Sequence, residues 1–490
     1  MASDPDKDPA PAAPPEPTDD LISTEHTLTV DGRELAYTAT TGRVVLREEV
    51  TDDGTSQGPK PKAEVFLTSY VLTGADAATR PVVFAFNGGP GSASVWLHLG
   101  LLGPRRVVAG DAGALTAPPY AVADNSETLL AHADLVFIDP VSTGFSRAVT
   151  GGKAGDFHGY QRDLDSVGEV IRLWTARHGR WMSPKFLAGE SYGTLRAAGL
   201  ARHLQERYGM NLNGIALISS VLDMATIGFT EGNDLPYPLF LPTYAAIAHF
   251  HGKHPGRPLD EVLVEAEEFA ERDYPWALAR GTRLTAEQRA SVVTRLATLT
   301  GLGADYIDRA DLRIEHIRFF TELLRADRRT VGRLDGRFTG WEADGVGERF
   351  TADPAMDAIM GPYTAAFNHY VRADLGYAND LPYEMLAGAI NRDWSYKEFE
   401  GRGVSVAHAL AAAMRANPHL RVHVSSGYHD GATPYAATEH TLAHLPIPTE
   451  LRRNIEVRYY EAGHMMYVHE PSRVQQSADL AAFITRSLPA

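Results

Sequence analysis

The sequence predicts an α/β protein in which helices cover a mostly parallel sheet and a long helical insertion divides the sheet domain. Two observations support this prediction. Short apolar runs that end in glycine or a polar residue recur in the first half of the chain and again near its end. Amphipathic stretches such as RDLDSVGEVIRLWTARHG separate some of these runs, a pattern typical of a parallel sheet buried on both faces.

The expected elements follow one another in a clear order. Asp31-Gly32 signals a tight hairpin between two strands of alternating polarity. Further strands are expected in PVVFAF, ADLVFID, KFLAGES, LNGIALISS, LRVHVSSG and NIEVRYY, and PSRVQQSADLAAFITRSL is expected to be a closing helix. From about Leu259 to Leu324 the sequence predicts charged helices instead.

These patterns divide the chain into four segments. Residues 1–22 are rich in Pro, Ala and Asp, a composition that predicts a disordered tail. Residues 23–223 and 401–490 are predicted to be the two parts of the α/β domain. Residues 224–400 are predicted to be a mainly helical cap insertion.

Composition excludes several classes of function. The 490 residues carry 46 Lys+Arg against 62 Asp+Glu, a net charge of −16 that disfavours nucleic acid as a partner. The chain has no cysteine, which excludes disulfides and thiolate chemistry. No segment approaches the ~20 apolar residues of a membrane span, and the acidic N-terminal residues, which have no apolar run, are not expected to be a signal peptide. We therefore expect a cytoplasmic protein with no membrane partner, and leave open export by a non-standard route.

The segment FLAGESYGTLRA places Ser191 between two glycines, where a predicted strand becomes a predicted helix. Gly189-Glu190-Ser191-Tyr192-Gly193 fits the G-x-S-x-G turn, which exposes a nucleophilic serine at the end of a strand. Glycine is needed there because larger side chains would collide with the neighbouring strand and helix. The alternative is a plain strand-to-helix turn with a capping serine.

A serine hydroxyl needs a base, and in this arrangement an acid and then a histidine follow it in the chain. Asp430 follows the run LRVHVSSG and His464 follows NIEVRYYEAG, so both are expected on loops after strands. Asp223 is the alternative acid. Three other histidines compete as the base, and for each the alternative is a solvated or packing role: His440, His444 and His469.

Oxyanion donors are expected from the N–H after the nucleophile, here Tyr192, and from an early glycine-rich loop. Asn87-Gly88-Gly89-Pro90-Gly91 follows an apolar strand and suits the second role. A phosphate-binding loop would need a Gly-Lys-Ser/Thr ending, which is missing, so a plain turn is the other alternative. Protein groups alone supply this chemistry and no H-E-x-x-H pattern is present, so we expect neither a metal nor an organic cofactor.

Five motifs occur in order and together resemble the serine carboxypeptidase family: NGGPGSAS, DPVSTGFS, GESYG, SGYHDGATP and EAGHMMY. The likeness covers most of the chain from Pro81 onward, except much of the middle insertion. It implies an α/β-hydrolase fold with a helical cap and a peptide substrate. It also implies that Ser191 is the nucleophile, Asp430 the orienting acid and His464 the base. The resemblance makes Gly89 and Tyr192 the oxyanion donors. The groups that it implies for holding the terminal carboxylate of a peptide are Asn87, Gly88 and Glu190.

Glu190 can donate a hydrogen bond to that carboxylate only when it is protonated, so acid conditions would favour binding. The family usually has a second glutamate nearby, where this chain has Leu101. Unless burial dominates, this loss predicts that Glu190 ionises at a lower pH than in members with both acids. Three further positions depart from the family. This chain has Ala85 where the family usually has Trp, and Ser92 where it usually has Cys. It has Tyr428 where the family's G-D-x-D motif has its first Asp.

Three hypotheses follow from these residues. The first is a serine carboxypeptidase that releases C-terminal amino acids through an acyl-enzyme on Ser191. The second is an esterase or acyltransferase with the same machinery. The third is a binding protein that kept the fold and lost activity, against which the intact set of Ser191, Asp430 and His464 argues. The sequence does not indicate side-chain preference or oligomeric state.

Overall fold

The computed structural model describes residues 16–488. Within them, ten strands form one central sheet in the order β1-β2-β3-β7-β4-β9-β10-β13-β14, with β8 paired to β3. β1, β2, β3 and β7 pair antiparallel, and the strands from β7 to β14 pair parallel. The strands have these bounds: β1 Asp20–Val30, β2 Arg33–Asp52, β3 Thr55–Leu72, β4 Val82–Phe86, β7 Asp134–Ile138, β8 Arg147–Ala148, β9 Lys185–Ser191, β10 Gly214–Ser220, β13 Arg421–Gly427 and β14 Ile455–Tyr460.

The hairpin predicted at Asp31-Gly32 is confirmed. Val30 pairs with Arg33, so the loop has two residues. Their φ angles of 49° and 74° suit the type I′ turn that matches strand twist. β1 begins at Asp20, inside the predicted tail, because its residues pair with β2 from that point on. Residues 1–15 of the predicted tail lie outside the described residues.

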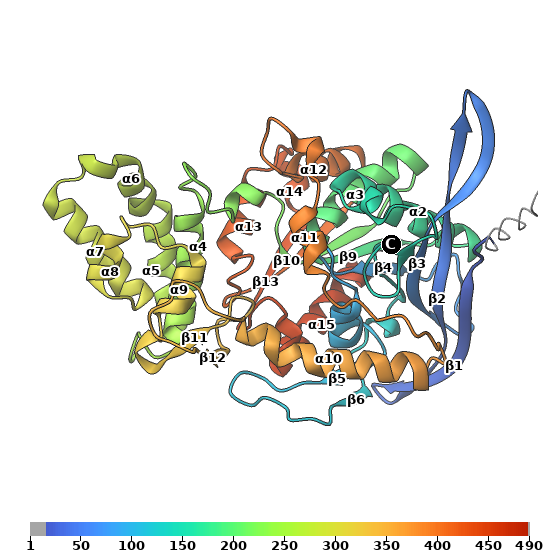
Figure 1. Ribbon diagram of the computed structural model, residues 1–490, viewed down its shortest axis with the longest axis horizontal. Coiled ribbons are helices and arrows are strands. Elements are labelled where there is room, and N and C mark those ends of the chain that lie inside the picture. Colours follow the sequence, from blue (N-terminus) through green and yellow to red (C-terminus); the bar gives the residue numbers. More distant parts are fainter. Residues whose placement is uncertain (1–15, 489–490) are drawn as a thin grey trace, which may run out of the picture.

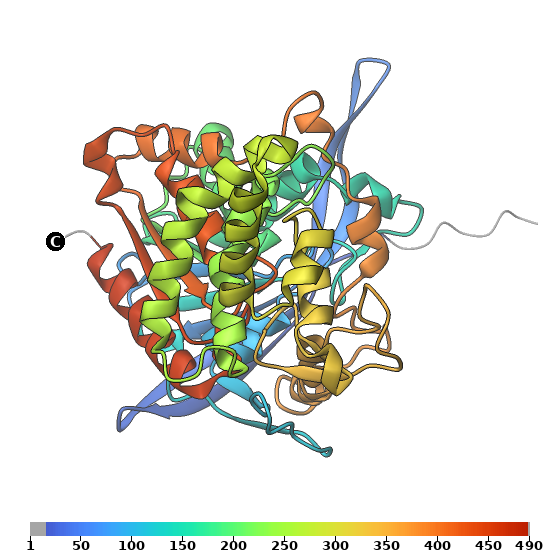
Figure 2. The same cartoon turned by 90° about the vertical axis from the view of Figure 1, so that its left-hand side faces the viewer.

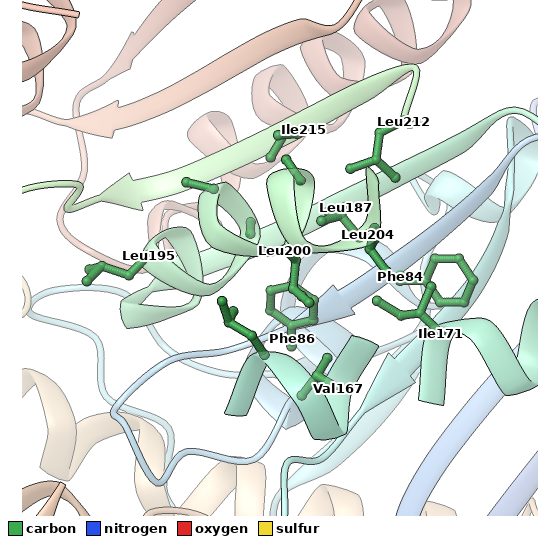
Figure 3. Packing of buried hydrophobic residues seen from close by; sticks show 14 of the residues in the cluster. Phe84, Phe86, Val167, Ile171, Leu187, Leu195, Leu200, Leu204, Leu212 and Ile215 are labelled. Atoms are coloured by element: carbon green, nitrogen blue, oxygen red, sulfur yellow. The ribbon is translucent and has the colours of Figure 1, made fainter. Parts of the chain in front are cut away.

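Helices cover both faces of the sheet, as the apolar runs predict. Alternate residues of β4 show the reason, because Phe84 and Phe86 pack in one apolar cluster and Val83 and Ala85 in another. Figure 3 shows the first cluster, with Phe84 and Phe86 facing side chains of the covering helices. The helices of this face are α2 Tyr160–Arg177, α3 Tyr192–Tyr208 and α12 Ala407–Ala416, and those of the other are α1 Val95–Leu97, α10 Pro354–Ala373 and α15 Glu470–Arg486.

The helical insertion has its own apolar cluster, which extends from Phe240 to Val331. Its helices gather at one end of the sheet domain, at the left of Figure 1 and facing the viewer in Figure 2. Helix α10 instead packs on the sheet, so the insertion defined by packing ends before α10 and not at the predicted residue 400. Its elements are α4 Pro236–Phe250, α5 Leu259–Glu271, α6 Asp273–Arg280, α7 Ala286–Thr300, α8 Ala304–Arg309, α9 His316–Glu322 and β11 Arg329–Val331, which pairs with β12 Thr339–Trp341.

The remaining strands and α-helices are short. They are the hairpin β5 Arg105–Val108 and β6 Ala121–Asp124, and the helices α11 Gly388–Asp393, α13 Tyr435–Ala443 and α14 Thr449–Arg452. Across residues 16–488, no helix combines the length and the apolar character that crossing a bilayer requires.

The parallel strands bring the predicted site residues to one edge of the sheet. β4, β9, β13 and β14 run in the same direction, so their carboxyl ends meet at that edge. The glycine loop follows β4, Ser191 ends β9, and the loops that carry Asp430 and His464 follow β13 and β14. Ligands of open α/β sheets bind at this edge.

Candidate active site

Ser191 lies in a strained turn between β9 and α3. Its φ of 59° and ψ of −129° are far from the values of a strand or a helix. Glycine is required two residues before it, because a Cβ at Gly189 would lie only 2.1 Å from the carbonyl oxygen of Gly193. The turn therefore has the geometry of a nucleophile elbow, and α3 begins directly after it at Tyr192.

Gly189→Ala is expected to lower the free energy of unfolding by about 2 kcal/mol or more, because the added methyl group meets backbone rather than a movable side chain. Hydrolytic activity should fall as well, because the backbone must move apart at the elbow and displace Ser191. Thermal denaturation and an ester assay measure both effects. The control is Gly303→Ala, where a Cβ meets no atom within 4 Å. A Gly189→Ala protein as stable and active as the wild type would contradict a tight elbow.

His464 and Asp430 form a buried pair. His464 Nδ1 lies 2.8 Å from Asp430 Oδ2. Asp430 Oδ1 accepts the backbone N–H groups of Ala432 (2.8 Å) and Thr433 (2.9 Å), and Oδ2 accepts the Thr433 hydroxyl at 2.7 Å. These contacts fix the carboxylate and commit Nδ1 of the imidazole to it, which leaves Nε2 as the nitrogen that can act on a hydroxyl.

The backbone and charge of His464 are also held in place. Its N–H donates to the carbonyl of Leu334 at 2.6 Å, and its carbonyl accepts the hydroxyl of Ser219. Burial disfavours the charged imidazole, but the charge and hydrogen bond of Asp430, together with the charge of Glu190, outweigh it and raise the pKa of His464. The protonated imidazolium, which forms when His464 takes a proton during catalysis, is thus stabilised.

Ser191 and His464 line the same cavity, which has a volume of about 320 Å³. The glycine loop, Glu190 and part of the insertion complete its wall. The lining residues are Asn87, Gly88, Gly89, Ser92, Trp96, Glu190, Ser191, Arg333, Leu334, Met356, Leu386, Gly388, Asn391, His464 and Met465. A cavity of this size can hold the end of a peptide or a small ester.

The glycine loop packs backbone against backbone on the elbow. A Cβ at Gly88 would lie 2.4 Å from the nitrogen of Tyr192, and Gly89 has a φ of 99°. Because Tyr192 is the first residue of α3, its N–H has no acceptor within the helix. The predicted donors, Gly89 and Tyr192, therefore belong to two backbone segments in direct contact. The guanidinium of Arg196 holds the loop by donating to the Asn87 carbonyl at 2.6 Å.

Glu190 is buried beside the nucleophile. Its Oε1 accepts Nδ2 of Asn87 at 2.8 Å, and its Oε2 accepts the hydroxyl of Tyr467 at 2.7 Å. Burial raises the pKa of Glu190 to about 7. Burial thus dominates, although Leu101 is itself buried in the apolar core and offers no second acid.

The competing residues lie elsewhere. His440 lies in α13 and His444 directly follows that helix, and both line a separate cavity of about 820 Å³ that does not include Ser191. His469 directly precedes α15. Asp223 caps a short turn by accepting the N–H of Ala225 at 2.9 Å.

Sequence reasoning missed three residues around the site. Thr433 orients Asp430, and Tyr467 bonds to Glu190. Both lie within the motifs SGYHDGATP and EAGHMMY, so their position three residues after Asp430 and His464 was an available signal. Arg333 lies in the predicted insertion, where no motif indicated a functional residue.

A model of the serine carboxypeptidase family matches residues 62–232, which confirms the predicted resemblance over that part of the chain. The matched segment contains the glycine loop and the elbow with Ser191, and it ends before Asp430 and His464. No curated protein matches the chain in sequence.

Many solved structures share features of the fold at low identity. A thermophilic esterase from Thermogutta terrifontis, solved with malate bound, has a TM-score of 0.38 and 12% identity, over 91% of this chain and 99% of that one. A thermostable carboxyl esterase from Bacillus coagulans has the same four values. A haloalkane dehalogenase variant from Bradyrhizobium elkanii has a TM-score of 0.34 and 13% identity, over 95% and 98% of the two chains. Similarities this weak assign no activity to this chain.

The chain has the α/β-hydrolase fold, as its sheet order and strand-to-helix elbow show. The family match adds support for a serine hydrolase.

Proposed function

We propose that this protein is a serine-type carboxypeptidase, which releases amino acids from the C-terminal ends of peptides. One observation carries the proposal. A buried glutamic acid with a pKa of about 7, Glu190, lines the same cavity as Ser191 and is bonded to Asn87. A carboxyl group that can stay protonated near neutral pH can bind another carboxylate. The family match supports the same activity.

In the proposed reaction, Nε2 of His464 takes the proton of the Ser191 hydroxyl as its oxygen attacks the last peptide carbonyl. The N–H groups of Gly89 and Tyr192 stabilise the oxyanion. His464 then gives the proton to the leaving amine, and an ester remains on Ser191. Water, deprotonated by His464, hydrolyses this ester and restores the serine. Every step uses groups of the protein and water.

Recognition of the chain end would come from other residues that line the cavity. Protonated Glu190 donates one hydrogen bond to the terminal carboxylate, and the side chain of Asn87 and the N–H of Gly88 donate others. An internal peptide bond has no carboxylate at that place and would leave these buried donors without a partner, which is costly. The arrangement thus favours removal of one residue at a time.

Two N-blocked dipeptides that differ only at the C-terminus test the proposal. We expect release of the C-terminal residue from the free acid at a rate at least about 100-fold higher than from the amide, because the amide loses a charge-assisted contact. Equal rates on both, or hydrolysis of neutral esters alone, would favour an esterase instead. The replacement of the second acid by Leu101 is the observation that favours this second candidate.

Glu190→Gln is expected to change the pH dependence of kcat/KM on the free-acid dipeptide. Glu190 loses its proton as pH rises through about 7, so wild-type activity should fall on the alkaline side. On the acid side activity should fall as His464 becomes protonated. The glutamine amide donates at any pH, so the alkaline limb should flatten. The acid limb should keep its position, because Glu190 is largely protonated there and carries little charge toward His464.

Glu439→Gln is the matched control, since burial also raises the pKa of Glu439 but its side chain lines the separate cavity. Its pH profile should be that of the wild type. Glu190→Gln should affect a small neutral ester far less than the dipeptide. If both substrates change equally and the pH profile stays the same, Glu190 has only a structural role in the elbow.

A further inference from the structure

We propose that Arg333 binds a carboxylate of the substrate, so that the cavity selects acidic substrates; this deepens the proposed function and rests on hydrolysis at Ser191. The residue comes from the helical insertion, two positions after β11. It lines the cavity together with Ser191, Glu190 and His464. Of the side chains that line it, Arg333 is the one with a permanent charge.

The guanidinium of Arg333 is available to a ligand. Across residues 16–488 its side chain forms neither an ion pair within 4.0 Å nor a hydrogen bond. The charge of Arg333 acts on the carboxyl group of Asp353, whose oxygens accept backbone N–H groups. Asp353 accepts the N–H groups of Arg333 (3.2 Å), Leu334 (3.1 Å) and Ala355 (3.1 Å). The positive charge of Arg333 is therefore not neutralised by a direct partner.

The same contacts fix Arg333 relative to the catalytic loop. Asp353 holds the backbone of Arg333 and Leu334, and the Leu334 carbonyl accepts the N–H of His464 at 2.6 Å. Next along the chain, Asp335 accepts the N–H of Gly463 at 3.1 Å. Two successive residues of the insertion are thus bonded to the loop of the base. The backbone of Arg333 is therefore held at a fixed position relative to the catalytic loop.

Carboxylate is the chemical class that fits such a group best. A guanidinium offers paired N–H donors that match the two oxygens of a carboxylate, and in a partly enclosed cavity the contact is stronger than in bulk water. Glu190 adds little opposing charge below pH 7, because burial raises its pKa to about 7. Two sources are compatible with a peptide substrate, namely the terminal carboxylate and an acidic side chain next to the scissile bond.

Two esters of similar size separate this role from peptide recognition: 4-nitrophenyl hemisuccinate, which carries a carboxylate, and 4-nitrophenyl butyrate, which does not. In Arg333→Gln the hemisuccinate-to-butyrate ratio of kcat/KM should fall by about tenfold or more. Arg333→Lys should retain part of the preference. Arg349→Gln, which changes an exposed arginine of the insertion, should leave the ratio unchanged. An Arg333→Gln protein with the wild-type ratio would overturn the proposal.

N-blocked dipeptides then distinguish the two sources. Glu and Gln are exchanged on either side of the scissile bond, with a free C-terminus throughout. If Arg333→Gln slows only the peptides with Glu at one position, Arg333 binds that side chain. If it slows all of them equally, Arg333 binds the terminal carboxylate. No change on any peptide would overturn the proposal, whereas a wild type that cuts esters but no peptide would reject only the carboxypeptidase function.

Discussion

Ser191→Ala is expected to lower kcat by at least about 10³-fold while the protein stays folded, because the substitution removes the one atom that forms the acyl-enzyme. The side chain of Ser191 makes no capping hydrogen bond to α3, so its loss should leave the melting temperature nearly unchanged. Kinetics on a free-acid dipeptide and on a neutral ester, with thermal denaturation alongside, measure both expectations. A fluorophosphonate probe should label the wild type and not this variant.

Ser92 provides a matched control, because its hydroxyl lines the same cavity and accepts Nε1 of Trp96 at 2.9 Å. Ser92→Ala should still react with the probe. Labelling that survives in Ser191→Ala and is lost in Ser92→Ala would show that the wrong serine is assigned. A wild-type protein that never reacts with the probe would favour an inactive binding protein on this fold.

His464→Ala should reduce kcat nearly as much as Ser191→Ala, and Asp430→Asn by about 10³- to 10⁴-fold. The hydrogen bonds of Asp430 explain the loss of kcat expected for Asp430→Asn. Oδ1 of Asp430 accepts two backbone N–H groups, so the NH₂ of an asparagine cannot take that place. It must face Nδ1 of His464, which would then accept a hydrogen bond from it and leave the ring proton on Nε2. The base would be held in the wrong tautomer.

Asp223→Asn is the control for the choice of acid. Among residues 16–488, the Asp223 side chain accepts a single hydrogen bond, from the backbone N–H of Ala225, so Asp223→Asn should retain near-normal activity. Kinetics of the three variants at one pH, with melting temperatures to exclude unfolding, decide between the two acids. Severe loss in Asp223→Asn with a neutral Asp430→Asn would make Asp430 the wrong choice.

Local sequence predicted the elements that position the site. The strand β4 was predicted from one apolar run, and alternate residues of that run now pack in the two clusters on either face of the sheet. The elbow was predicted because glycines at 189 and 193 leave space that no other residue could leave. These signals are strong because strand burial and steric exclusion act over a few neighbouring residues.

The rest depended on contacts between residues far apart in the chain. The hydrogen bond from Tyr467 to Glu190 joins residues 277 positions apart, so it depends on the fold bringing the motif EAGHMMY next to the elbow. The packing of α10 on the sheet depends on contacts with strands that are distant in the chain. Local sequence does not contain these contacts, so this helix was predicted to belong to the insertion. Arg333 is near the catalytic loop only because Asp353 and His464 hold its neighbours there.

Incubation of the purified protein with a mixed peptide library, followed by mass spectrometry of the products, tests the proposed function most directly. The proposed carboxypeptidase should produce peptides shortened from the C-terminus by one residue and then by further single residues, with N-termini intact. The Ser191→Ala protein should leave the library unchanged. Cleavage at internal bonds, or an unchanged library with a wild type that still hydrolyses neutral esters, would contradict it.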